Sequence, residues 1–102
     1  MTAPNGSPVH DRPPLSNLAK VHQHLPRRPL WLCRACSGPW PCPFARMLLR
    51  VEYDRNRASL AVYMAGQLFD ATGDFLKLYP DTGPNPEQLW ARFLAWTAVK
   101  PG

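Results

Sequence analysis

The three cysteines of this chain lie within one ten-residue stretch, and this cluster constrains the fold more than any other feature. Cys33 and Cys36 form a C-x2-C pair, and Cys42 follows after five further residues. A C-x2-C pair can place two thiolates on one side of a tight turn, at the spacing that a single metal ion needs. A structural zinc takes four ligands from cysteine and histidine, so one more ligand is expected nearby. His24 is the first candidate, and His22 is the alternative.

Proline content decides where regular structure can lie. Nine of the 13 prolines occur in the first 43 residues. Because proline lacks a backbone N–H and fixes φ, this part cannot be mostly helix or sheet. We therefore expect residues 1–15 to be a disordered tail and residues 16–99 to form one helical domain, with a Cys/His knuckle over 22–42. A core of about 60 residues is marginal by itself, so a metal that ties the knuckle to it would add stability.

Apolar residues at helical spacing predict three helices, over residues 43–54, 57–78 and 86–98. The last begins with a clear signal, because Asn85 can cap it and Pro86 suits its first position. No strand pattern stands out. The predicted fold class is mostly α: a small three-helix bundle with an N-terminal proline-rich, metal-stapled segment.

Two details of these helices carry further expectations. In the first helix one apolar stripe is formed by Phe44, Met47, Leu48 and Val51. In the second helix, Gly66 and Gly73 are interior residues, and each costs about 1 kcal/mol relative to alanine. We expect close helix packing to compensate for these glycines.

Four kinds of chemistry compete for the cysteines. Inert buried cysteines are rarely so clustered, and a C-x2-C redox pair needs a βαβ context that is missing. An Fe–S cluster normally takes four cysteines, and only three are present. Zinc with one histidine satisfies both the ligand count and the preference for soft ligands. The predicted metal ligands are therefore His24, Cys33, Cys36 and Cys42.

No residue pattern signals catalysis. No glycine-rich phosphate loop or H-E-x-x-H motif is present. Asp70 and Asp74 lie one helical turn apart, and we interpret them as a solvated helix face.

Charge and apolar content narrow the partners and the compartment. The formal net charge of +5 is compatible with nucleic acid as a partner, but no run of like charges occurs, which favours a solvated basic surface. No stretch approaches the ~20 apolar residues of a membrane span, and none has the pattern of a signal peptide. With an odd number of cysteines, this indicates a cytoplasmic chain whose thiols stay reduced.

The segment from His24 to Arg46, with the stretch from Leu89 to Trp96, resembles a family of small actinobacterial proteins. These share the pattern H-x-P-x-R-P-x-W-x-C-x2-C-x2-PWPC-x2-AR, in which His24 is the histidine. Members are commonly labelled flavin reductase, so the resemblance implies an oxidoreductase with a flavin. It covers about residues 22–97, and no flavin-binding motif is recognisable in this sequence.

A looser resemblance, carried by Cys33, Cys36 and Cys42, is to WhiB-like regulators. These hold a [4Fe–4S] cluster through four cysteines, so this resemblance implies a redox-linked regulator. The separate first cysteine of that family and its glycine-rich turn are absent here.

The residues together favour a small zinc-stapled accessory or protein-interaction module that is not an enzyme. Its expected partner is another protein. The alternatives are a flavin reductase-type oxidoreductase and an Fe–S or redox-linked regulator.

Overall fold

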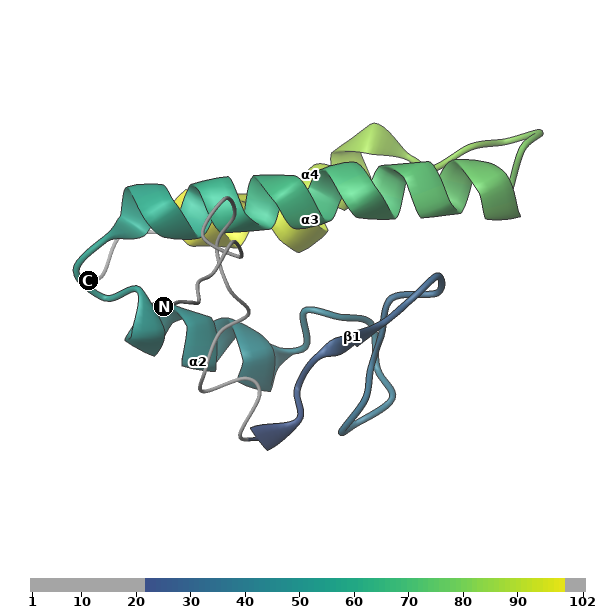
Figure 1. Cartoon of the computed structure of the whole chain (residues 1–102). Helices are drawn as coiled ribbons and strands as arrows, with labels where there is room; N and C mark the ends of the chain where they lie inside the picture. The colour runs from purple at the N-terminus through teal and green to yellow at the C-terminus, as the bar shows by residue number, and fades with distance from the viewer. Residues whose placement is uncertain (1–21, 99–102) are drawn as a thin grey trace, which may run out of the picture.

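A computed structural model describes residues 22–98, so the tail predicted over residues 1–15 lies outside the described part. A short hairpin leads into three helices and a final 3-10 turn (Figure 1). The elements are β1 (Pro26–Arg27), β2 (Leu32–Cys33), α2 (Pro43–Glu52), α3 (Arg57–Leu78), α4 (Pro86–Phe93) and η3 (Ala95–Ala98). The predicted mostly α, three-helix fold is confirmed.

The hairpin is the only sheet in the described residues, and it is very short. β1 and β2 are antiparallel, with Pro26 opposite Cys33 and Arg27 opposite Leu32. A single further bridge joins Leu32 to Pro39. Because prolines cannot donate to a ladder, the pairing stops after two residues on each strand. Further backbone hydrogen bonds close the turns of the knuckle, such as that from the Arg34 N–H to the Leu25 carbonyl at 2.9 Å, and side-chain contacts attach the knuckle to the helices.

The start of α2 connects the knuckle to the helices. Cys42 is the N-cap residue, its sulfur accepts a hydrogen bond from the Ala45 N–H, and Pro43 occupies the first turn. The helix ends at Glu52, two residues before its predicted end, and Tyr53 is its C-cap. A cysteine in this position belongs to the knuckle and to the helix at the same time.

The predicted apolar stripe of α2 is wrong in its orientation. Leu48 is buried as expected, but the side chains buried beside it are Ala45 and Leu49. The other three stripe residues are about half exposed or more: Phe44 57%, Met47 48% and Val51 60%. The rotation of α2 about its axis is limited by Cys42, whose sulfur has to face the knuckle while it caps the helix.

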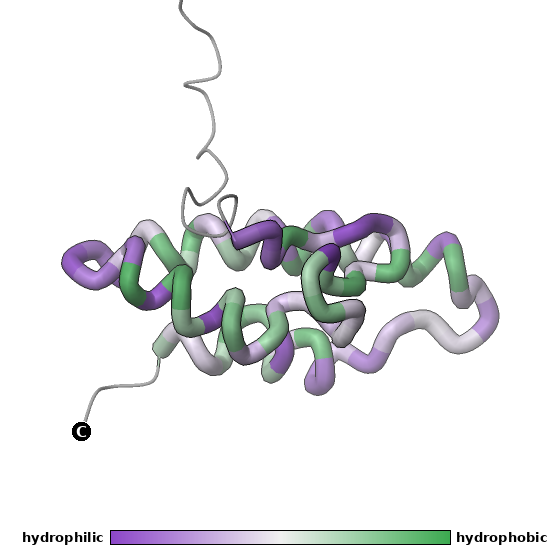
Figure 2. The backbone as a smooth tube through the Cα atoms, turned by 90° about the horizontal axis from the view of Figure 1, so that it is seen from below, coloured by the Kyte–Doolittle hydropathy of each residue, from purple (hydrophilic) through white to green (hydrophobic). Residues whose placement is uncertain are grey.

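The long helix α3 forms one wall of the core and spans the predicted residues. Asn56 caps it by accepting a hydrogen bond from the Ser59 N–H at 3.0 Å. Its buried side chains are Leu60, Tyr63, Met64 and Ala71. In Figure 2 hydrophobic and hydrophilic stretches alternate along each helix, as expected where one face of a helix packs on the core.

The structure contradicts the expectation that close helix packing compensates for the two glycines of α3. A Cβ atom added to Gly66 or Gly73 would have no neighbour within 4 Å. Close packing within the chain therefore does not compensate for their cost of about 1 kcal/mol each.

The last helix closes the core and is shorter than predicted. α4 ends at Phe93, the chain changes direction at Leu94, and it continues as the 3-10 turn η3. The predicted apolar face is nevertheless buried, because Leu89, Phe93 and Trp96 are at most 7% exposed. Among the described helices, none is both long and apolar enough to cross a bilayer.

The cap of α4 can be tested directly. The Asn85 side chain accepts a hydrogen bond from the Gln88 N–H at 3.1 Å. We expect Asn85→Ala to lower the free energy of unfolding by about 1 kcal/mol, measured by denaturant titration, because that N–H loses its acceptor. Asn85→Asp keeps an acceptor and should stay close to the wild type. Equal losses in both variants would show that the cap does not stabilise α4.

Candidate metal centre

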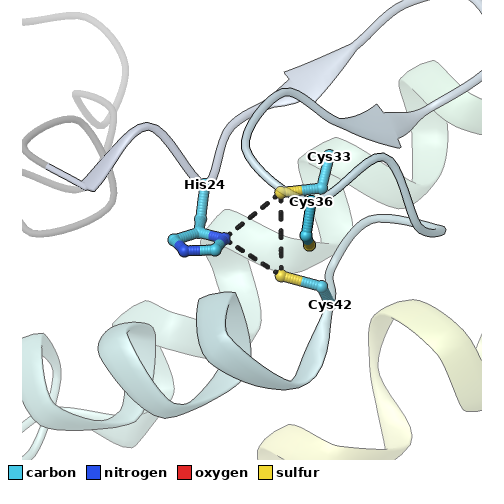
Figure 3. A group of neighbouring side chains, drawn as sticks. All are labelled: His24, Cys33, Cys36 and Cys42. Atoms are coloured by element: carbon cyan, nitrogen blue, oxygen red, sulfur yellow. Dashed lines mark hydrogen bonds between the residues drawn. The ribbon is translucent and has the colours of Figure 1, made fainter.

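Four side chains from separate parts of the knuckle converge on one point (Figure 3). His24 precedes β1, Cys33 ends β2, Cys36 follows in a turn, and Cys42 caps α2. Their potential ligand atoms, one nitrogen and three sulfurs, all lie within 4.8 Å of one another. These are the four residues that the cysteine spacing singled out, and His22 is not in the group.

The distances agree with the geometry of one tetrahedral ion. Zn–S bonds of about 2.3 Å and Zn–N bonds of about 2.0–2.1 Å place two sulfurs about 3.8 Å apart, and a sulfur and a nitrogen about 3.6 Å apart. The sulfurs of Cys33 and Cys42 are 3.7 Å apart. The Nδ1 atom of His24 is 3.3 Å from the Cys33 sulfur and 3.4 Å from the Cys42 sulfur. These residues fit a mononuclear metal site.

The turn after β2 presents Cys33 and Cys36 to the same point. The Ser37 N–H donates to the Cys33 carbonyl at 2.8 Å, and the Cys33 N–H donates to the Gly38 carbonyl at 2.7 Å. Ser37 closes this turn in the left-handed region, with φ at 64°. Cys33 is buried, whereas Cys36 is exposed at the outer edge of the site.

The surroundings of the two buried thiols differ. Burial by itself raises the pKa of Cys33, but N–H groups of Cys36 and Ala35 directed at its sulfur lower that pKa to about 7. Burial raises the pKa of Cys42 to about 11, although the Ala45 N–H opposes this. The surroundings of Cys33 therefore favour its thiolate form even without a metal. A bound cation would favour deprotonation of Cys42 as well.

His24 is held on two sides. Its ring stacks on the ring of Phe44 with centroids 5.1 Å apart and planes inclined by 9°. Its carbonyl oxygen accepts a hydrogen bond from the Trp40 indole N–H at 2.9 Å. These contacts limit both the ring and the backbone to positions in which Nδ1 faces the sulfurs.

The knuckle is attached to α3 through Asp74. Its carboxylate accepts a hydrogen bond from the buried Trp31 indole N–H at 2.8 Å, and two from the Arg28 guanidinium at 2.8 and 3.1 Å. The bonds from Arg28 and Trp31 lower the pKa of Asp74 below its ordinary value, although burial acts against them. Asp70 lies 3.8 Å from the same guanidinium. The predicted solvated face is thus wrong for Asp74, which docks the knuckle on α3.

Arg92 attaches the knuckle to α4. Its guanidinium donates to the carbonyl oxygens of Trp31 at 2.7 Å and Trp40 at 2.8 Å. Both tryptophans are almost fully buried, and both rings lie beside the ring of Phe93. The Trp31 carbonyl also accepts the Trp40 N–H at 2.8 Å, so Arg92 adds a second donor there. Arginine provides several donors in a planar fork, which suits two neighbouring carbonyls.

Sequence reasoning missed Arg92 and Asp74, although a signal was present. Arg92 lies three residues after Leu89 and four before Trp96, within the apolar face of the last helix. Asp74 lies three residues after the buried Ala71. A charged residue within an apolar stripe indicates a buried partner, but the stripe alone does not say which partner.

Comparisons of this chain with models of protein families, with curated proteins and with solved structures found no match. The resemblances described from the sequence motifs therefore stay predictions, and the interpretation of the site depends on its own geometry.

The attachment through Asp74 can be tested by mutation. We expect Asp74→Ala to lower the free energy of unfolding by about 1–3 kcal/mol, because the buried Trp31 N–H is left without its acceptor. Asp74→Asn keeps an oxygen for Trp31 and should lose less. Asp81→Ala removes an exposed carboxylate from a loop, and it should leave stability nearly unchanged.

The same contact predicts a pH dependence. A carboxylate with a lowered pKa in the folded state stabilises the protein above the pKa of the unfolded chain, about 3.9, and the effect is lost as pH falls through the folded pKa. The stability difference between wild type and Asp74→Ala should hold at pH 7 and shrink below about pH 4. A difference that does not change with pH would contradict a charge-dependent contact.

Proposed function

We propose that this chain is a small zinc-stapled protein-interaction module without enzymatic activity, working in a reducing, cytoplasmic setting. The observation that carries the proposal is the convergence of His24 Nδ1 and the sulfurs of Cys33, Cys36 and Cys42 within 4.8 Å of one another. Three cysteines and one histidine form a donor set that is common in structural zinc sites.

The ligand count supports a structural role for the ion. Catalytic zinc sites have three protein ligands and keep the fourth position for water or substrate. Four protein ligands would fill a tetrahedral zinc completely. When bound, the ion would link the segment before β1, the turn after β2 and the start of α2.

The distances favour one ion over an iron–sulfur cluster. In a [4Fe–4S] cluster the thiolates bind separate irons and surround the cluster. Here two sulfurs are 3.7 Å apart and a histidine nitrogen lies 3.3–3.4 Å from both, which suits ligands that share one ion. The site also offers three cysteines, one fewer than such clusters normally use.

The flavin alternative has less support. Small-molecule sites usually enclose about 300–1,000 Å³. A cavity between α2, α3 and η3 measures only about 80 Å³ and is lined by Arg50, Tyr53, Asp54, Arg57, Leu60 and Thr97. This cavity would not accept a flavin ring system.

Exposed apolar side chains support a role in protein interaction. Phe44, Met47 and Val51 form an outward stripe on α2, next to the metal centre through the contact between Phe44 and His24. Contiguous apolar surface on a small domain commonly marks an interaction site. A zinc-held knuckle would keep this surface in a defined position.

Elemental analysis of protein purified under reducing, chelator-free conditions tests the metal. We expect about one zinc per chain, and loss of the zinc in Cys36→Ser and His24→Ala. Loss of the ion should lower the free energy of unfolding by several kcal/mol, because metal binding and folding are coupled. His22→Ala is the matched control, since this neighbouring histidine lies outside the site, and it should keep both zinc and stability.

Three results would contradict the zinc module. If the purified protein contains no stoichiometric metal, the cysteines would have a role in packing or in redox chemistry instead. Broad visible absorbance with iron after anaerobic purification would favour the regulator, and tight flavin binding with NAD(P)H oxidation would favour the oxidoreductase.

A further inference from the structure

The outward face of α3 carries a regular seam of five residues. Val62, Gly66, Phe69, Gly73 and Leu76 follow one another at alternating intervals of four and three. This is the spacing of the a and d positions of a coiled coil, with glycine at each a position and a large apolar residue at each d position. We call these five residues the α3 seam.

The α3 seam lies away from the core of the molecule. Val62, Phe69 and Leu76 are 65%, 79% and 51% exposed. At 3.6 residues per turn, the buried residues of α3, such as Met64 and Ala71, lie on the opposite side of the helix from the seam. Leu76 lies beside Gly83 of the loop after α3, and about half of its surface still remains exposed.

The two glycines of the seam have no packing role inside the chain. Neither has a positive φ, so the backbone does not require glycine, and a Cβ atom at either position would meet nothing within 4 Å. Both residues reduce helix propensity. Their effect on shape is to leave two hollows along the seam, each beside a large exposed side chain.

We infer that a second copy of this chain docks antiparallel on the α3 seam. In antiparallel coiled coils an a position faces a d position of the partner. One register then places Phe69 against Gly73 and Leu76 against Gly66, and two-fold symmetry repeats both contacts. The register one heptad away places Phe69 against Gly66 and Val62 against Gly73. In either register two of the three large side chains of the seam meet a hollow. The third, Val62 in the first register and Leu76 in the second, lies beyond the partner's glycines.

Other arrangements fit the seam less well. In a parallel, in-register pair glycine would face glycine and Phe69 would face Phe69, which leaves voids beside crowded rings. An isologous antiparallel pair uses one patch twice and closes, as most homodimers do. The seam carries no charged residue, so pairing would not desolvate an ion. The hollows and large side chains of one copy therefore match those of the other.

The length of the seam bounds the affinity. From Val62 to Leu76 the helix rises about 21 Å. A single helix seam of this length buries less than the roughly 800 Å² per partner that is typical of stable interfaces. We therefore expect a reversible dimer with a dissociation constant between about 1 μM and 1 mM.

Sedimentation equilibrium on the purified, metal-loaded full chain tests the dimer. The mean mass should rise from one chain towards two over this concentration range. Phe69→Lys should remain a monomer throughout, with the same melting temperature as dilute wild type because the Phe69 side chain is exposed. Leu30→Lys changes an exposed apolar residue in the turn between β1 and β2, outside both apolar surfaces, and it should dimerise like the wild type.

Replacing the two glycines should change the stability of the monomer and the affinity of the dimer in opposite directions. The double variant Gly66→Ala, Gly73→Ala should raise the melting temperature of the dilute monomer, because alanine favours helix and meets no neighbour within the chain. It should also weaken the dimer about tenfold or more, because the added methyl groups fill the hollows that receive the partner's side chains. Equal or tighter dimerisation would overturn the inference.

The orientation can be read by cross-linking. A photoreactive phenylalanine analogue placed at residue 76 should cross-link to the partner near residue 66 in the first register or near residue 59 in the second, whereas cross-links to residue 76 itself would contradict the antiparallel pair. A chain that stays monomeric up to about 1 mM, or a dimer that Phe69→Lys leaves intact, would also overturn it.

The second copy gives the proposed interaction module a partner, and in that respect the inference rests on the proposed function. The seam does not include the metal ligands, so zinc analysis of the same samples separates the two. Zinc-containing monomers would contradict only the dimer, and metal-free dimers would contradict only the zinc site.

Discussion

The structure depends on how the helices hold a proline-rich segment whose own strands, β1 and β2, pair over only two residues each. Few ladder hydrogen bonds therefore stabilise the knuckle. Side chains from the helices replace them. Asp74 on α3 receives the Trp31 indole, and Arg92 on α4 donates to the carbonyls of Trp31 and Trp40. A bound ion would add a link of similar kind at the other end of the knuckle.

Cys42 has a central place in this arrangement because it serves two structures. It caps α2, and its sulfur lies 3.7 Å from that of Cys33. A residue with both roles restricts the direction and the rotation of the helix that follows. As a consequence Ala45 and Leu49 turn towards the core, while Phe44 turns outwards and stacks on His24. The geometry of the candidate metal site and the exposure of Phe44 on α2 thus both depend on Cys42.

The candidate metal centre and the α3 seam use different residues. The knuckle is attached to α3 through Asp74, whereas Val62, Phe69 and Leu76 of the seam are half exposed or more. A structural metal site with four protein ligands offers no open position for chemistry. In the proposed module the exposed surfaces would take the functional role, and their positions depend on a small core to which the knuckle contributes Trp31 and Trp40.

Local patterns in the sequence determined the three helices, the Asn85 cap and the three cysteines of the candidate metal group, with His24 as the first choice for the fourth ligand. Helical spacing, the Asn85-Pro86 start signal and the spacing of Cys33, Cys36 and Cys42 act over a few residues, so they are readable without a fold. Only tertiary structure decided which face of α2 is buried, because two overlapping stripes share Leu48 and the choice depends on Cys42. The same holds for Asp74 and Arg92, whose partners lie 43 and 61 residues away in the chain. Such contacts arise when separate elements pack, and no local periodicity encodes them.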